Sequence, residues 1–287
     1  MILLLAIVTY GYARRVHTLS GTPRAVPLAR RISFYAAIFI LVAEPLSPLA
    51  AGDDTSFLSH MIEHLTIGDL AALLMVLGIT GPVIQPLLKI HVIAALRPLT
   101  NPLVALAFWV VNMYAWHLPL MFEAALNHDA VHVLQHMLFF GAGFNMWMAL
   151  FGPLPQPDWF GNAAKLFYIV GVRLAGVLLG NVFVFSGTAY YQQYADTATN
   201  FWGLSPAADQ SIAGAVMMTE GALITFILFG WLFFKAANEG ESSQQLLDLA
   251  DEHGVELSDA RSARAAAAGT TDMLRDRIVS RLDNPEN

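Results

Sequence analysis

Long apolar stretches, separated by short polar segments, recur along the chain as far as residue 234. A helix needs about 20 apolar residues to cross a hydrocarbon core that is about 30 Å thick. Backbone groups in lipid have to be paired within their own segment, so the stretches indicate helices rather than open strands. The pattern predicts an all-α, polytopic bundle of about seven membrane helices, at about residues 1–13, 32–51, 57–79, 103–125, 130–151, 165–189 and 210–234.

Composition agrees with a membrane protein, because 56% of the 287 residues are hydrophobic and only 13% are charged. The net charge is −7, but residues 239–287 alone hold 11 acidic residues and 5 arginines. The sequence therefore predicts a nearly neutral transmembrane bundle over residues 1–238 and an acidic tail over residues 239–287 that is partly helical or disordered. We expect the protein to lie in the lipid bilayer and to bind no nucleic acid. The sequence does not predict its oligomeric state.

Positive charges orient the predicted bundle, because loops that carry Lys and Arg stay in the cytoplasm. Basic residues occur in four segments that would lie on one side of the membrane. They are Arg14, Arg15, Arg24, Arg30 and Arg31 between the first and second helices, Lys89 and Arg97 between the third and fourth, Lys165 before the sixth, and Lys235 after the seventh. The loops on the other side, near residues 53–54, 127–129 and 190–209, contain no Lys or Arg. We expect the N-terminus outside and the C-terminus in the cytoplasm.

Two histidine pairs open the third and fifth predicted helices. Each pair follows the pattern H-x-x-[E/Q]-H, in His60-Met61-Ile62-Glu63-His64 and in His132-Val133-Leu134-Gln135-His136. Residues four apart share one helix face with their Cβ atoms about 5–6 Å apart, so each pair can offer two imidazoles to one ion. The two helices run in the same direction, and the pairs are therefore expected at matching depth on the outer side.

Further polar and sulfur-bearing side chains fall in the same layer. His117, near the outer end of the fourth predicted helix, would bring the number of converging histidines to five. The chain has no cysteine, so a metal would have to be held by His, Met or carboxylate groups. The accessory candidates are Glu44, Glu63, Gln135, Met61, Met137 and, at the start of the seventh helix, Asp209. Two further methionines, Met113 and Met121, lie close in sequence.

Imidazole together with thioether favours copper, especially Cu(I), although imidazole also suits zinc, iron or haem. A structural network of hydrogen-bonded core histidines is the alternative. Ionisable residues inside a membrane are costly and usually mark a functional site, so the repeated spacing favours metal or haem binding.

Two other patterns concern the architecture. The histidine motifs are 72 residues apart, and the same offset aligns Ala43-Glu44-Pro45-Leu46 with Ala115-Trp116-His117-Leu118, which suggests a parallel repeat of two-helix units. Deeper in the bundle, Asp69 and Arg173 fall at similar heights. Because an unpaired charge is costly there, we expect them to form a buried pair.

The constellation resembles the seven-helix CtaG family of cytochrome c oxidase (caa-type) assembly factors, over about residues 30–238. The matching stretches are His60–His64, Asn112 with His117-Leu118-Pro119, His132–His136 with Trp147, and Trp202-Gly203-Leu204-Ser205 followed by Asp209-Gln210 and Met217. On the seventh helix the chain departs from the pattern, with Ala213-Gly214 and Met217-Met218 in place of Gly-Gly and Met-Trp. The resemblance implies a multi-pass protein of the bacterial plasma membrane that handles copper for a haem–copper oxidase, with the oxidase subunits as partners.

Three other functions stay open at the level of sequence. H-x-x-E-H is also the inverted zincin motif, in which Glu63 would activate a zinc-bound water, although Gln135 replaces it in the second copy. A haem held by two histidines and a transporter built on the repeat are the others. A metal chaperone that works by ligand exchange needs no catalytic group. The sequence therefore favours the hypothesis of an assembly factor without enzymatic activity.

Overall fold

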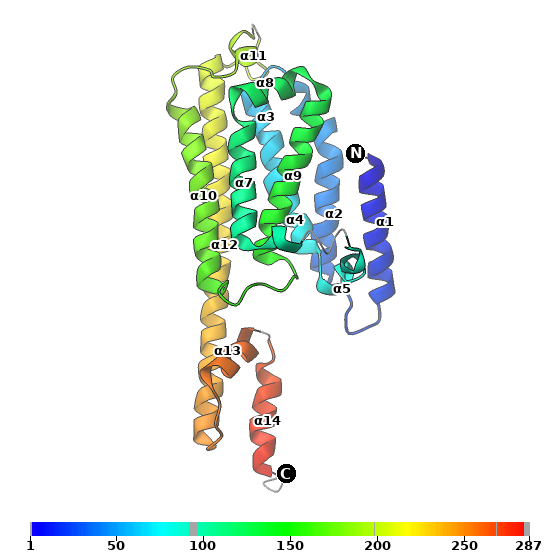
Figure 1. Ribbon diagram of the computed structural model, residues 1–287, viewed down its shortest axis with the longest axis vertical. Helices are drawn as coiled ribbons and strands as arrows, with labels where there is room; N and C mark the ends of the chain where they lie inside the picture. The colour runs from blue at the N-terminus through cyan, green and yellow to red at the C-terminus, as the bar shows by residue number, and fades with distance from the viewer. Residues whose placement is uncertain (1, 92–96, 198, 268, 284–287) are drawn as a thin grey trace. The chain divides into compact units, whose positions relative to one another are not determined.

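The computed structural model describes residues 2–91, 97–197, 199–267 and 269–283, and within them the chain is helical, with no strand. The helices and short turns of helix, in chain order (Figure 1), are α1 Ile2–Leu19, α2 Leu28–Ala43, η1 Glu44–Leu46, η2 Ala50–Gly52, α3 Phe57–Leu65, η3 Thr66–Ala71, α4 Ala72–Gly78, α5 Gly81–Ile84, η4 Leu87–Lys89, η5 Arg97–Thr100, α7 Pro102–Trp116, α8 Pro119–Asn127, α9 Asp129–Phe151, α10 Asn162–Phe185, α11 Gln192–Ala195, α12 Pro206–Glu252, α13 Asp259–Ala267 and α14 Thr271–Asp283. The segment η3 is a single π-helical stretch between α3 and α4.

The all-α membrane bundle predicted from the sequence is confirmed, but fewer than seven described helices meet the length and hydropathy expected of a membrane span. Four segments qualify: Leu28–Gly52, Phe57–Gly78, Asn162–Phe185 and the long helix Pro206–Glu252. The pair α7 and α8 makes a fifth if it is counted as one broken span. Among the described residues α1 and α9 fall outside this set, and α9 is the helix that carries His132 and His136.

The predicted span at residues 103–125 is two helices rather than one. The helices α7 and α8 meet at an angle of 71°. The bend follows from Pro119, which occupies the first turn of α8 and cannot donate a backbone hydrogen bond to a continuing α7. His117 consequently lies in the break between two helices instead of on a helix face.

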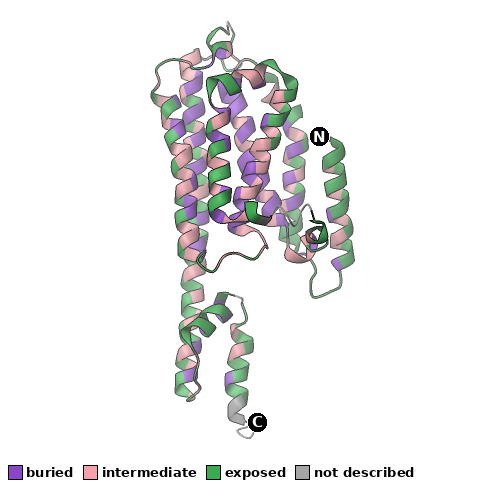
Figure 2. Ribbon diagram, in the orientation of Figure 1, coloured by how far each residue is buried: buried purple, intermediate pink, exposed green. Residues whose placement is uncertain are grey.

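The segment α3–η3–α4 lies at the centre of the bundle. In its most apolar stretch 61% of the residues are buried, against 22–39% in the other three candidate spans. Burial in Figure 2 likewise concentrates on the helix sides that face the interior of the bundle. Helices α2 and α9 both pack against this segment.

Glycines allow the closest of these approaches. A Cβ on Gly143 of α9 would collide with the carbonyl oxygen of Gly68 in η3. A Cβ on Gly78, at the end of α4, would lie 2.6 Å from Cβ of Phe34 in α2. The central segment is therefore held against both neighbours at distances that only glycine permits.

The chain divides into two compact units, Met1–Leu223 and Ile224–Asn287, and the division falls within α12. The second unit contains α13 and α14, and its small apolar core consists of Leu246, Ala250, Ala265 and Ile278. The hydroxyls of Ser243 and Ser262 lie 2.8 Å apart beside this core. Of the tail expected at 239–287, the described residues are thus largely helical, and residues 284–287 lie outside the described part.

Candidate metal centre

The start of α3 fixes the first histidine pair. Ser56 is the N-cap, and its hydroxyl oxygen accepts a hydrogen bond from the backbone N–H of Ser59 at 3.2 Å. Asp209, at the start of α12, accepts from the Ser56 hydroxyl at 2.8 Å and from the N–H of Phe57 at 2.7 Å. Asp209, predicted as an accessory metal ligand, is therefore engaged at the N-terminus of α3, where a carboxylate also offsets the positive end of the helix dipole.

The four histidines of the two motifs meet between α3 and α9. The rings of His60 and His64 are 4.1 Å apart between centroids, and those of His132 and His136 are 4.3 Å apart. Across the helices, His60 stacks on His132 at 5.4 Å, and His64 lies 5.0 Å from His136. Both helices start at the same end of the bundle (Figure 1), so the structure brings the two pairs together at one depth, as the sequence predicts.

Two overlapping groups of these side chains have the spacing of metal ligands. One ligand atom from each of His60, His64 and His132 lies within 4.8 Å of the others, and the same holds for Glu63, His132 and His136. A metal ion with bonds of about 2 Å holds its ligand atoms somewhat closer together than this. The side chains of either group would have to move closer together to enclose one ion.

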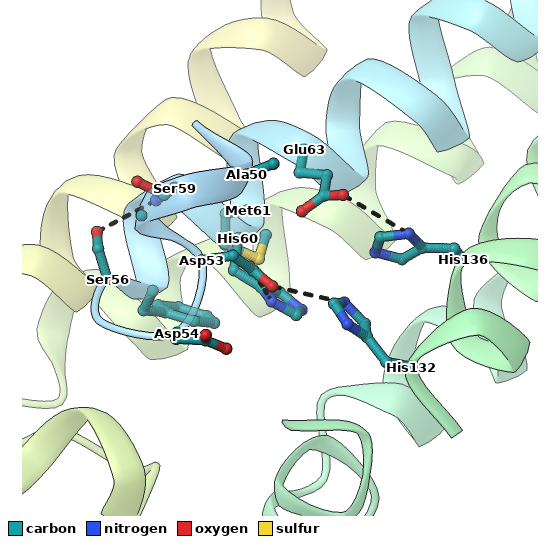
Figure 3. A network of polar contacts seen from close by, with 12 residues as sticks. Ala50, Asp53, Asp54, Ser56, Ser59, His60, Met61, Glu63, His132 and His136 are labelled. Atoms are coloured by element: carbon teal, nitrogen blue, oxygen red, sulfur yellow. Dashed lines mark hydrogen bonds and ion pairs between the residues drawn. The ribbon is translucent and has the colours of Figure 1, made fainter. Parts of the chain in front are cut away.

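Asp53 completes the first group, and sequence reasoning did not select it. Its Oδ1 lies 2.5 Å from Nδ1 of His60, and its Oδ2 lies 3.6 Å from Nε2 of His132 (Figure 3). Burial raises the pKa of Asp53, but the neighbouring imidazoles of His60 and His132 outweigh burial, so the pKa lies below its usual range. Asp53 is thus an anion placed between one histidine of α3 and one of α9.

A hydrogen bond from α11 holds the loop that carries Asp53. The hydroxyl of Tyr194, in α11, donates to the backbone carbonyl of Asp53 at 2.9 Å. Burial raises the pKa of Tyr194 well above its usual value, so the phenol keeps the proton that it donates. Further along, the indole N–H of Trp202 donates to the Ser59 hydroxyl at 3.0 Å.

Two buried glutamates adjoin the second group. Oε1 of Glu63 lies 3.6 Å from Nδ1 of His136 (Figure 3). The carboxyl of Glu44, in the 3₁₀ turn that ends α2, contacts the carboxyl of Glu63. Two buried carboxylates side by side repel each other when both are ionised, and a proton or a cation between them relieves that repulsion.

Not all of the predicted ligands join this cluster. His117 is buried but belongs to neither three-residue group, because the break after α7 places it against Met61, with Nε2 3.5 Å from the Met61 sulfur. Met137, predicted as an accessory ligand, is 60% exposed, and it follows His136 directly, which turns it about 100° around the helix from that histidine. Gln135 is fully buried, and neither of its amide atoms has a hydrogen-bond partner among the described residues.

The predicted charge pair lies deeper in the bundle. Nη1 of Arg173, in α10, donates to Oδ2 of Asp69 at 2.7 Å, and both residues are largely buried. The guanidinium also lies over the ring of Trp147, 5.4 Å from its centroid, and the Trp147 indole N–H donates to the backbone carbonyl of Asp69. Asp69 sits in the π-helical stretch η3, so the pair joins the central segment to α9 and α10.

The fold and the site together define an all-α membrane protein that encloses histidine and carboxylate side chains, the kinds that bind metal ions, between two central helices. The chain belongs to the cytochrome c oxidase caa3 assembly factor family, which it matches over residues 9–239. It is also similar to two uncharacterised proteins, from Mycobacterium bovis and Mycobacterium tuberculosis, each 24% identical over 77% of this chain and 36% of the relative. The chain thus spans about a third of the length of these curated relatives. No solved structure matches it significantly.

Proposed function

We propose that this protein assists the assembly of a haem–copper cytochrome c oxidase by binding a metal ion, preferably copper, between α3 and α9 and passing it to an oxidase subunit. Membership of the assembly-factor family supports the link to the oxidase. The observation that carries the metal is the cluster of four histidines and the Asp53 carboxylate between the first turns of α3 and α9.

The chemistry of this proposal is ligand exchange. Neutral imidazoles of His60, His64 and His132 would capture the ion, and the Asp53 carboxylate would offset part of its charge. His132 also belongs to the group that contains Glu63 and His136. An ion could therefore move from one group to the other by exchanging two ligands while His132 holds it.

The location of the cluster follows from the charge pattern of the loops. The proposal places the histidines near the outer surface of the bacterial plasma membrane, with the N-terminus outside and the acidic tail in the cytoplasm. It counts α1 and α9 as membrane spans beside the four apolar segments and the bent pair, which makes seven. Helix α9 has 23 residues, about 35 Å at 1.5 Å per residue, and this length is sufficient to cross the hydrocarbon core.

The test is metal analysis of the purified protein in detergent after loading with copper, with zinc as a second probe. The double variant His60→Ala with His132→Ala removes one ligand from each helix and is expected to lose the metal bound at this cluster. The matched control is His128→Ala, an exposed histidine at the end of α8 next to the start of α9. A double variant that folds and still retains the metal content of the wild type would refute the proposal.

The competing functions make different predictions for the same sample. A zinc hydrolase needs Glu63 free to activate water, whereas this carboxyl lies against Glu44 and His136. Hydrolysis that is lost in Glu63→Gln with the metal retained would favour the enzyme. A haem between His60 and His132 would have to displace His64 and His136, whose rings lie against them. We therefore expect no Soret absorption band.

A further inference from the structure

Met61, in α3, and His117, in the break between α7 and α8, face each other inside the bundle. Nε2 of His117 lies 3.5 Å from the sulfur of Met61, and both side chains are buried. The hydroxyl of Tyr191 donates to the backbone carbonyl of His117 at 2.9 Å, which fixes the break between α7 and α8 at this point. The pair is thus held by the fold rather than by an exposed loop.

The hydrogen bond on the other ring nitrogen decides what Nε2 can do. Nδ1 of His117 lies 2.7 Å from the backbone carbonyl oxygen of Met113. A carbonyl oxygen only accepts hydrogen bonds, so Nδ1 carries the proton of the neutral imidazole, and Nε2 presents a lone pair. A thioether sulfur has no proton to donate either. Two electron-pair donors therefore face each other in a buried place, and a cation between them would satisfy both.

The distance between the two atoms fits a shared ion. Bonds of about 2.0 Å to nitrogen and about 2.3 Å to sulfur, at the tetrahedral angle of about 110°, place the two ligand atoms about 3.5 Å apart, which is the separation that His117 and Met61 have. The Met113 carbonyl fixes the ring orientation, as second-layer partners of metal-bound histidines commonly do.

A small cavity adjoins the pair. Its volume is about 50 Å³, and its lining includes Met61, His64, Met113, His117 and Met217. A cavity needs only about 10–15 Å³ of such space to hold one water molecule, so this one has room for a metal ion. Thioether and imidazole donors favour a soft monovalent ion over zinc or magnesium.

We propose that Met61 and His117 form a second metal site, for Cu(I), that is distinct from the cluster between α3 and α9. The inference rests on the proposed function, because His64 lines the cavity and also belongs to the group with His60 and His132. His64 has two ring nitrogens, and it can serve as the shared ligand through which the ion passes from one site to the other. No oxidation or reduction is involved, since the ion enters and leaves as Cu(I).

The experiment loads the full-length protein in detergent with Cu(I) under anaerobic conditions and measures X-ray absorption at the copper edge. In the wild type we expect two copper ions per chain and a sulfur neighbour at about 2.3 Å. Met61→Leu preserves the side-chain volume and should remove the sulfur neighbour and lower the affinity of this site at least tenfold. The control Met137→Leu changes an exposed methionine and should leave both properties unchanged.

The two hypotheses fail in different ways. A wild type that shows only nitrogen and oxygen neighbours, or a sulfur neighbour that persists in Met61→Leu, overturns the second site. If the copper seen in that wild type is lost in His60→Ala with His132→Ala, the proposed function stands without it. Conversely, if this double variant keeps all of the copper of the wild type with its sulfur neighbour, the second site stands and the cluster between α3 and α9 is not a metal site.

Discussion

Replacing Gly143 by alanine tests whether the spacing of α3 and α9 sets the geometry of the histidine cluster. An alanine Cβ at this position would lie 2.9 Å from the carbonyl carbon of Gly68 and closer still to its oxygen, whereas ordinary Cβ contacts begin at 3.4 Å. The obstacle is backbone, which cannot rotate away as a flexible side chain can. Because the carbonyl oxygen is the nearer atom, the two helices have to separate by about 1 Å or more.

That displacement is large on the scale of a metal site. Gly68 lies one helical turn beyond His64, and Gly143 lies two turns beyond His136, so a separation at the crossing is transmitted to both histidine pairs. Metal sites keep their ligand distances within about 0.2 Å. Overpacking of this kind costs about 1–3 kcal/mol, and if about 1.4 kcal/mol of it falls on the metal-bound geometry, affinity drops about tenfold.

The assay is chelator competition on the purified variant, together with thermal unfolding in the same detergent. Gly143→Ala removes no candidate ligand, yet it should bind metal at least about tenfold more weakly than the wild type. The control is Gly141→Ala, two residues away on the same helix, where an added Cβ meets nothing within 4 Å. Wild-type affinity in Gly143→Ala would refute the reasoning that this crossing sets the ligand spacing.

Three further substitutions separate the roles of the buried acids. Asp53→Asn removes the anion between two histidines and should weaken metal binding about tenfold or more in chelator competition, while Asp54→Asn, which is exposed, should not. Asp209→Ala leaves the first turn of α3 without its acceptor and should lower the free energy of unfolding by about 1–3 kcal/mol, measured by denaturant titration. Arg173→Met leaves Asp69 buried and unpaired and should cost about 3–5 kcal/mol in the same titration; the double variant with Asp69→Asn should recover part of this loss, and strictly additive losses would contradict the pairing.

Helical periodicity was sufficient to predict the histidine pairs. A spacing of four residues puts His60 with His64 and His132 with His136 on one face each, and the alternation of membrane helices makes α3 and α9 parallel, so that equal distances from the helix starts become equal depths. The same argument by depth found the pair of Asp69 and Arg173. These predictions hold because a residue's position in a helix sets both its angle around the helix axis and its height along that axis.

The residues that periodicity missed or misplaced lie where the helix stops or turns. Asp53 belongs to a loop, and its carboxylate reaches His60 only because Tyr194, more than a hundred residues away, holds that loop. His117 was expected on a helix face, but Pro119 forces a break just after it, and the imidazole turns to Met61 instead. Met137 directly follows His136 and is 60% exposed, so nearness in sequence to a histidine does not place a side chain on the same helix face.

The repeat suggested by the 72-residue offset relates the two histidine pairs of the cluster to each other. It also identifies the positions at which the two copies differ. Under that offset α2, which ends at Ala43, corresponds to α7, which ends at Trp116, within one residue of the aligned position. The carboxylates come from the first unit alone, because the position of Glu63 corresponds to Gln135 in the second unit. One wall of the cluster is therefore acidic and the other carries neutral donors. A bound cation would lie between a side whose carboxylates offset its charge and a side that offers only neutral imidazole and amide donors.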